Sequence, residues 1–207
     1  FPGQVTATAT YELSGDALAI TYAATTDAPT AVNLTNHGYW NLDLAADGQT
    51  GTIDGHRLRL DAPRYLPVDD AGIPTGGLAD VTGTPFDLRA GVDLGPAMAA
   101  AGGGFDHCFE VGGPELLGPH GTLRRAAVLS SPARGRWMTV HTDQVGVQCY
   151  TGNGLHPPFE VHGSVSLETQ LFPDTPNRPD LGSARLDPGD EYQSVTVLRF
   201  GVGGAPD

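Results

Sequence analysis

The sequence predicts an all-β fold of the sandwich type, and three observations support this. Apolar and polar residues alternate along about ten short segments, which is the pattern of strands with one buried face. The 29 glycines and 17 prolines fall between these segments, where they mark turns. The only helical candidate is one short stretch, residues 92–101. Many short strands at regular spacing, with Gly and Pro turns between them, are typical of a β-sandwich.

The chain opens with a predicted hairpin. Residues 5–13 and 17–24 alternate apolar and polar side chains, and Ser14-Gly15-Asp16 between them is a turn signal. A third predicted strand covers residues 31–40. The other predicted strands are residues 56–66, 106–111, 125–130, 136–141, 145–150, 164–170 and 192–202.

We expect residues 1–207 to form a single domain. The chain is 39% hydrophobic, no linker or repeat divides it, and sandwiches of this length are commonly one unit. Two connections, residues 67–86 and 171–187, are longer than a hairpin requires. Long ordered loops in compact domains tend to carry function, so both are candidates for functional loops.

The charge balance argues against nucleic acid as a partner. Acidic residues outnumber basic ones by 24 to 11, which gives a formal net charge of −13. The basic residues are scattered, and Arg124-Arg125 is their only adjacent pair. Binding to a phosphate backbone depends on clustered Lys and Arg, so nucleic acid is not expected. A phosphorylated substrate is disfavoured for the same reason.

Cysteine content and hydropathy indicate the compartment. Cys108 and Cys149 are too few for a disulfide framework and lack metal-ligand spacing, so we expect both to be free and buried. No apolar stretch reaches the ~20 residues that a membrane helix needs, and the first residues show neither a basic n-region nor an apolar h-region. We therefore expect a cytoplasmic protein that does not interact with a membrane.

Glu168 is a candidate general base. The alternation in residues 164–170 places Val165 and Leu167 on one strand face and Ser166 and Glu168 on the other. A single Glu on such a face is more often solvated than catalytic. The prolines just downstream and the lack of a nearby charge partner favour a site instead. A Glu that acts as a base near neutral pH needs its pKa raised from about 4.3 by partial burial.

His37 is the second titratable candidate. A lone histidine is more often structural, but Asn33, Asn36 and Asn41 surround this one in an otherwise apolar segment. Asn is a poor strand former, and it persists in a strand pattern mainly when its amide has a dedicated partner. A Glu and a His together suit acid and base chemistry near neutral pH. Amides, hydroxyls and aromatic rings around them suit a polyhydroxylated, uncharged ligand.

Two more segments hold candidate ligand-binding residues. Asp106 and His107 follow a run of three glycines, where an Asp that caps its own loop is an equally good interpretation. Gln148 and Tyr150 share one face of a predicted strand. An amide beside a ring suits sugar recognition, although core packing explains the pair equally well.

In their order along the chain, these segments resemble the aldose 1-epimerase family, whose members are also called galactose mutarotases. The resemblance rests on residues 33–42 around Asn36-His37, residues 72–76 with 83–87, residues 105–107, residues 146–153, and residues 167–177 around Glu168-Thr169-Gln170. Together these segments span nearly the whole chain.

The resemblance implies a large antiparallel β-sandwich of the galactose mutarotase-like supersandwich type. It implies an isomerase that interconverts the α and β anomers of a free hexose such as galactose or glucose. Glu168 matches the family's base, which takes the proton from the C1 hydroxyl, and His37 matches the acid, which protonates the ring oxygen. Asp106 and Gln148 match positions that bind sugar hydroxyls. No cofactor and no metal are implied.

The resemblance also implies residues that have no counterpart in this sequence. The N-terminal portion of the family domain carries a substrate-binding Arg and another active-site His in a His-Gly-Gly motif. That portion is absent from this chain, and we expect slow turnover from these 207 residues alone. The alternative to an enzyme is a carbohydrate-binding β-sandwich without turnover, and an epimerase for sugar phosphates is a third option.

Overall fold

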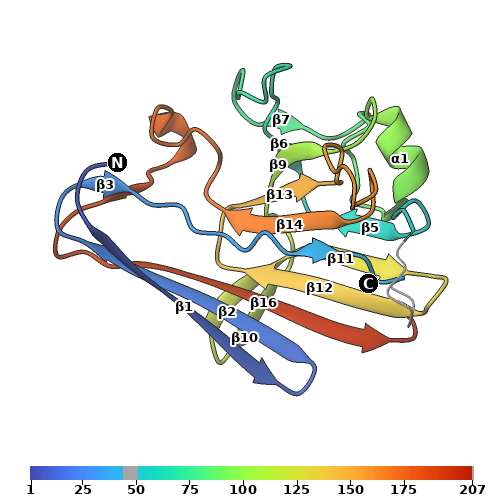
Figure 1. The fold of residues 1–207 in the computed structure, drawn as a ribbon, viewed down its shortest axis with the longest axis horizontal. Helices are drawn as coiled ribbons and strands as arrows, with labels where there is room; N and C mark the ends of the chain where they lie inside the picture. The colour runs from blue at the N-terminus through green and yellow to red at the C-terminus, as the bar shows by residue number, and fades with distance from the viewer. Residues whose placement is uncertain (44–50, 207) are drawn as a thin grey trace.

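The computed structural model describes residues 1–43 and 51–206, in which most of the regular structure is β-strand. Two antiparallel sheets lie one above the other, and the short helix α1 (Leu94–Ala100) lies at one end (Figure 1). The predicted all-β sandwich is therefore confirmed.

The larger sheet has eight strands in the order β1-β2-β16-β12-β11-β5-β8, with β10 paired to β11 beside this path. The predicted hairpin opens it, and Gly15 in its turn has φ +60°, a value that favours glycine. β1 is the edge strand, and all of its residues are exposed. The strands are β1 (Val5–Ser14), β2 (Ala17–Thr26), β5 (Arg57–Leu60), β8 (Val92–Asp93), β10 (Glu115–Gly118), β11 (Gly121–Ser131), β12 (Arg136–Thr142) and β16 (Tyr192–Val202).

The smaller sheet has six strands in the order β4-β14-β13-β9-β6-β7, and three of the predicted site residues, Glu168, Gln148 and Asp106, lie on it. Its strands are β4 (Tyr39–Trp40), β6 (Arg64–Tyr65), β7 (Ala79–Asp80), β9 (Asp106–Glu110), β13 (Gly146–Tyr150) and β14 (Val165–Gln170). A separate two-stranded pair consists of β3 (Thr30–Ala31) and β15 (Arg185–Leu186), and the 3-10 helix η1 (Pro179–Leu181) precedes β15.

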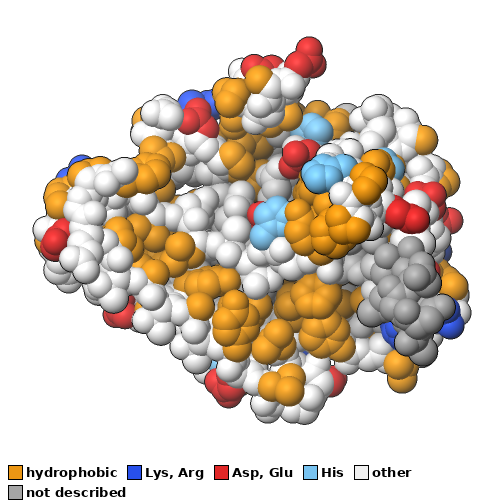
Figure 2. Space-filling view, in the orientation of Figure 1, with side chains coloured by type: hydrophobic (Ala, Val, Ile, Leu, Met, Phe, Trp, Pro, Cys, Tyr) orange, Lys and Arg blue, Asp and Glu red, His pale blue; other side chains and the backbone are white. Residues whose placement is uncertain are grey.

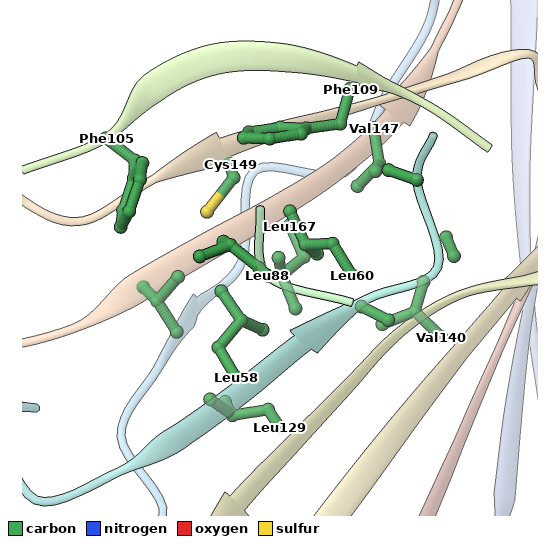
Figure 3. Packing of buried hydrophobic residues seen from close by; sticks show 14 of the residues in the cluster. Leu58, Leu60, Leu88, Phe105, Phe109, Leu129, Val140, Val147, Cys149 and Leu167 are labelled. Carbon is green, nitrogen blue, oxygen red and sulfur yellow. The ribbon is translucent and has the colours of Figure 1, made fainter. Parts of the chain in front are cut away.

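The hydrophobic core fills the space between the two sheets. Figure 3 shows Phe109 and Leu167 of the smaller sheet above Leu58 and Leu129 of the larger one. Phe109, Leu58 and Leu129 are each 0% exposed. Truncating a buried Phe to Ala costs about 3–5 kcal/mol, so these residues hold the smaller sheet firmly in place.

Two predicted strands are wrong in extent. Residues 31–40 form a strand only at their two ends, because the segment between them is irregular. Residues 56–66 divide into β5 and β6, which belong to different sheets. Pro63 lies where the chain crosses between them, and proline has no N–H to donate to a sheet. The predicted helix over residues 92–101 is shorter, since β8 takes its first two residues.

The expectation for the two cysteines is confirmed. Cys108 and Cys149 are free and buried, as predicted. Within residues 1–43 and 51–206, no helix has the length and apolar character to cross a membrane.

Candidate active site

Glu168 lies in the middle of β14, and the neighbouring strand places Gln148 directly opposite it. The residue is only 8% exposed, so the interpretation of a solvated strand face is wrong. Val165 and Leu167 point to the opposite side and join the core, as the alternation predicts. The strand therefore anchors its apolar face in the core and holds one carboxylate on the other face.

His37 and Glu168 are in direct contact despite their distance in sequence. The His37 Nε2 atom is 3.3 Å from the Glu168 Oε1 atom. The two side chains differ in exposure, with 48% for His37 and 10% for Glu168. The histidine thus faces solvent above a nearly buried carboxylate.

Asparagine side chains hold the segment that carries His37. The Asn33 amide accepts from the Leu171 N–H (2.9 Å) and donates to the Leu171 carbonyl (3.2 Å), which ties the segment to the end of β14. Asn36 accepts from the Gly38 N–H, and Asn41 donates to the Gly163 carbonyl. The prediction that these amides have dedicated partners is confirmed, and it explains why the segment is not a strand.

Asp106 and Gln148 lie beside the pair. Gln148 Nε2 donates to Asp106 Oδ1 over 2.7 Å, and Gln148 sits between Glu168 on one side and Cys108 on the other in the strand register. The Gln148 Oε1 atom is buried and has no hydrogen-bond partner among the described residues. The structure therefore brings all four predicted site residues together on one face of the smaller sheet.

A locked turn fixes the start of β9, where Asp106 lies. The Thr151 hydroxyl accepts from the Phe105 N–H at 2.7 Å and donates to Asn153 Oδ1 at 2.7 Å. Asn153 Nδ2 donates to the Phe105 carbonyl. Gly104 has φ +133°, and a Cβ there would overlap the Asn153 side chain. Position 104 therefore requires glycine. The hydrogen bonds of Thr151 and Asn153 hold this loop, in place of the predicted Asp that caps its own backbone.

Burial dominates the electrostatics of the carboxylate. It raises the pKa of Glu168, the nearby Asp106 charge raises that pKa further, and His37 opposes the shift. The direction is the one that a base working near neutral pH requires. A raised pKa at a residue beside a specific charge partner is also typical of functional sites.

His37 has three close neighbours, of which Tyr150 was a candidate for sugar recognition, whereas Tyr39 and Ser166 were not predicted as site residues. Its ring lies 4.8 Å from the Tyr39 ring and 6.2 Å from the Tyr150 ring, between centroids. The Ser166 Oγ atom is 3.2 Å from His37 Nδ1. Ser166 shares a strand face with Glu168, and this alternation is the sequence signal that could have identified Ser166 as a site residue. Figure 2 shows the face of the molecule on which histidine and acidic side chains gather beside a hollow.

The other candidate residues lie elsewhere. His107 points to the opposite side of β9 from Asp106, where its ring packs 4.6 Å from Phe86, and burial lowers its pKa. Among the residues that the structure describes, no three His, Cys, Asp or Glu side chains gather as metal ligands. The site combines one nearly buried carboxylate, one imidazole and polar groups that suit hydroxyls.

These features define a class: a β-sandwich protein with a paired carboxylate and imidazole on one face of the smaller sheet. A sequence model of the aldose 1-epimerase family matches residues 1–199. The chain belongs to the aldose 1-epimerase family.

Known relatives agree with this assignment. The galactose mutarotase of Mus musculus is 40% identical over 211 residues, which cover 98% of this chain and 59% of that protein. The aldose 1-epimerase of Escherichia coli (strain K12) is 36% identical over 216 residues, which cover 97% and 60%. The crystal structure of a GalM/aldose epimerase homologue from C. elegans superimposes with a TM-score of 0.85 at 26% identity, covering 98% and 62%. The chain thus spans less than two thirds of the length of these proteins.

Proposed function

We propose that the whole protein is an aldose 1-epimerase that interconverts the α and β anomers of a free hexose such as galactose or glucose. The observation that carries this proposal is the 3.3 Å contact between His37 Nε2 and Glu168 Oε1. This contact brings together a candidate base and a candidate acid. The chain belongs to the aldose 1-epimerase family, and its relatives are named for this reaction.

The proposed reaction needs one proton removed and one delivered. Glu168 takes the proton from the C1 hydroxyl, and His37 gives a proton to the ring oxygen. The C1–O5 bond then breaks as the C1=O1 double bond forms, which yields the open-chain aldehyde. Rotation about C1–C2 presents the other face of the carbonyl. Return of both protons closes the ring as the other anomer, so no atom or electron is gained or lost.

The direct contact between the pair places a constraint on this mechanism. Acid and base must each reach one of two neighbouring sugar oxygens by a hydrogen bond of about 2.6–3.2 Å, which calls for a separation of roughly 5–8 Å. The observed separation of 3.3 Å is shorter. A bound sugar must therefore come between them and break this contact, and the exposed His37 is the partner that can move.

Asp106 and Gln148 are proposed to hold the sugar hydroxyls. A buried acceptor such as Gln148 Oε1, which lacks a partner among the described residues, favours a hydroxyl donor. Asp106 is exposed and adds a charged acceptor next to it. The portion of the family domain that this chain does not match is proposed to supply further contacts.

Polarimetry tests the proposal directly. Freshly dissolved α-galactose and α-glucose are followed with and without the protein expressed from its natural start. Acceleration over the spontaneous rate supports an epimerase. Saturable sugar binding without acceleration instead supports a carbohydrate-binding module, and acceleration limited to a hexose 6-phosphate supports the sugar-phosphate alternative.

A further inference from the structure

Ser166 lies directly beneath His37. It is on β14, two residues before Glu168 and on the same strand face, and it is 0% exposed. Its register neighbours are Tyr150 on one side and Tyr39 on the other. These are the same two aromatic residues whose rings lie next to the His37 ring.

The two nitrogens of His37 contact two residues of one strand. Nδ1 is 3.2 Å from Ser166 Oγ, and Nε2 is 3.3 Å from Glu168 Oε1. Residues two apart on a strand are separated by about 6.6 Å, so the imidazole spans from one side chain to the next. Since His37 is largely exposed and lies in an irregular segment, burial alone does not fix its ring.

A hydroxyl suits both protonation states of an imidazole, because it donates one hydrogen bond and accepts others. In the neutral resting state, the Ser166 O–H donates to Nδ1 and the proton resides on Nε2. When His37 is an imidazolium, Nδ1–H donates to Ser166 Oγ. A backbone carbonyl at this place would serve only a protonated Nδ1 and would favour the other neutral tautomer.

We propose that Ser166 is a positioning residue that orients the His37 ring so that the proton which His37 transfers is the one on Nε2. The proposal rests on the epimerase function proposed above. The other titratable groups that face the ring are Glu168, Tyr39 and Tyr150. Ser166 is the neutral group at Nδ1, so its removal changes the tautomer without changing the charge of the site.

Nitrogen-15 NMR of the imidazole tests the positioning step without any activity measurement. In the neutral form of His37, the wild-type protein should show Nε2–H and an unprotonated Nδ1. In Ser166→Ala the two nitrogen shifts should converge toward a mixture of tautomers, and Ser166→Thr, which retains the hydroxyl, should restore the wild-type pattern. Ser130→Ala, in β11 of the other sheet, is the control and should leave the pattern unchanged.

Kinetics then test the consequence for the reaction. Ser166→Ala should lower kcat roughly 10-fold with little change in KM, since misplacing a catalytic group costs turnover more than binding. Ser166→Thr should recover most of it. If Ser166→Ala does not fold, Ser166→Cys keeps the volume with a poor donor and should give the same two changes. Unchanged nitrogen shifts in a folded variant would overturn the proposal. A tautomer change in a protein without mutarotase activity would instead refute the proposed function alone.

Discussion

Glu168 carries its charge where burial disfavours it. Burial and Asp106 raise the pKa of this carboxyl above its ordinary value, so the folded protein binds its proton more tightly than the unfolded chain. The contribution of Glu168 to stability is therefore complete below the unfolded pKa and is lost as pH rises through the folded pKa. A base that is useful near neutral pH is kept at the expense of stability.

Glu168→Gln should relieve this conflict. The neutral amide has the same shape, so the gain in unfolding free energy over wild type should grow as pH rises from 4 to 8. Urea unfolding of both proteins at several pH values measures this difference. A difference that is flat with pH, or that shrinks, would show that the Glu168 charge is well accommodated in the fold.

Asp106→Asn should lower the pKa of Glu168, because it removes a neighbouring negative charge. The carboxyl carbon of Glu168, followed by NMR titration, should then titrate at lower pH than in wild type. In an active protein, the acidic limb of the pH–rate profile should move the same way. Asp190→Asn in an exposed turn serves as the matched control. A Glu168 titration that stays in place would mean that the two carboxylates do not interact.

At the element scale, the site depends on segments that are not strands. The segment between β3 and β4 and the turn after β13 are shaped by side-chain amides and hydroxyls bonded to backbone. Alternation of apolar residues predicted a strand over residues 31–40, since Val32 and Leu34 fit that period. The three asparagines indicated amide partners, but Asn33 and Asn41 bind the backbone of Leu171 and Gly163, which lie far away in sequence.

Gly104→Ala tests whether the locked turn matters to the site. The new methyl would overlap Asn153 and approach Thr151 Oγ1 to 2.8 Å, and the backbone has φ +133°. Breaking the hydrogen bonds of Phe105 and forcing this conformation should lower the unfolding free energy by about 1–3 kcal/mol. Thermal melts measure the loss, and Gly103→Ala, with nothing within 4 Å of its added Cβ, separates backbone strain from the clash. Equal losses in both variants would show that the Asn153 contact is unimportant.

At the scale of the whole molecule, the sandwich was predictable because its strands alternate and its turns carry Gly and Pro. The grouping of Glu168, His37, Asp106 and Gln148 followed from the resemblance, and the structure gives its physical basis in the order β4-β14-β13-β9. The contact of His37 with Ser166 and the tyrosines was not predicted. It depends on strand register and on the path of residues 32–38, which local sequence patterns do not specify.

Buried histidines should make the whole fold sensitive to mild acid. Burial lowers the pKa of His56, His107 and His141. For a depressed histidine pKa, stability is lost as pH falls below the unfolded value of about 6.5. We expect the urea midpoint to be lower at pH 5 than at pH 7. His56 is 0% exposed and accepts from the Leu42 N–H, so His56→Gln, which keeps an acceptor, should reduce this pH dependence. An unchanged pH dependence in that variant would assign the effect to other groups.

The central claim is that Glu168 and His37 act together on the anomeric centre. Polarimetry of freshly dissolved α-galactose, comparing wild type with Glu168→Gln in the protein expressed from its natural start, tests it most directly. We expect Glu168→Gln to retain sugar binding while turnover falls by about 10²–10⁴, the contribution of a general base. Mutarotation at the wild-type rate by a folded Glu168→Gln protein would contradict the account, because another group would then have to be the base.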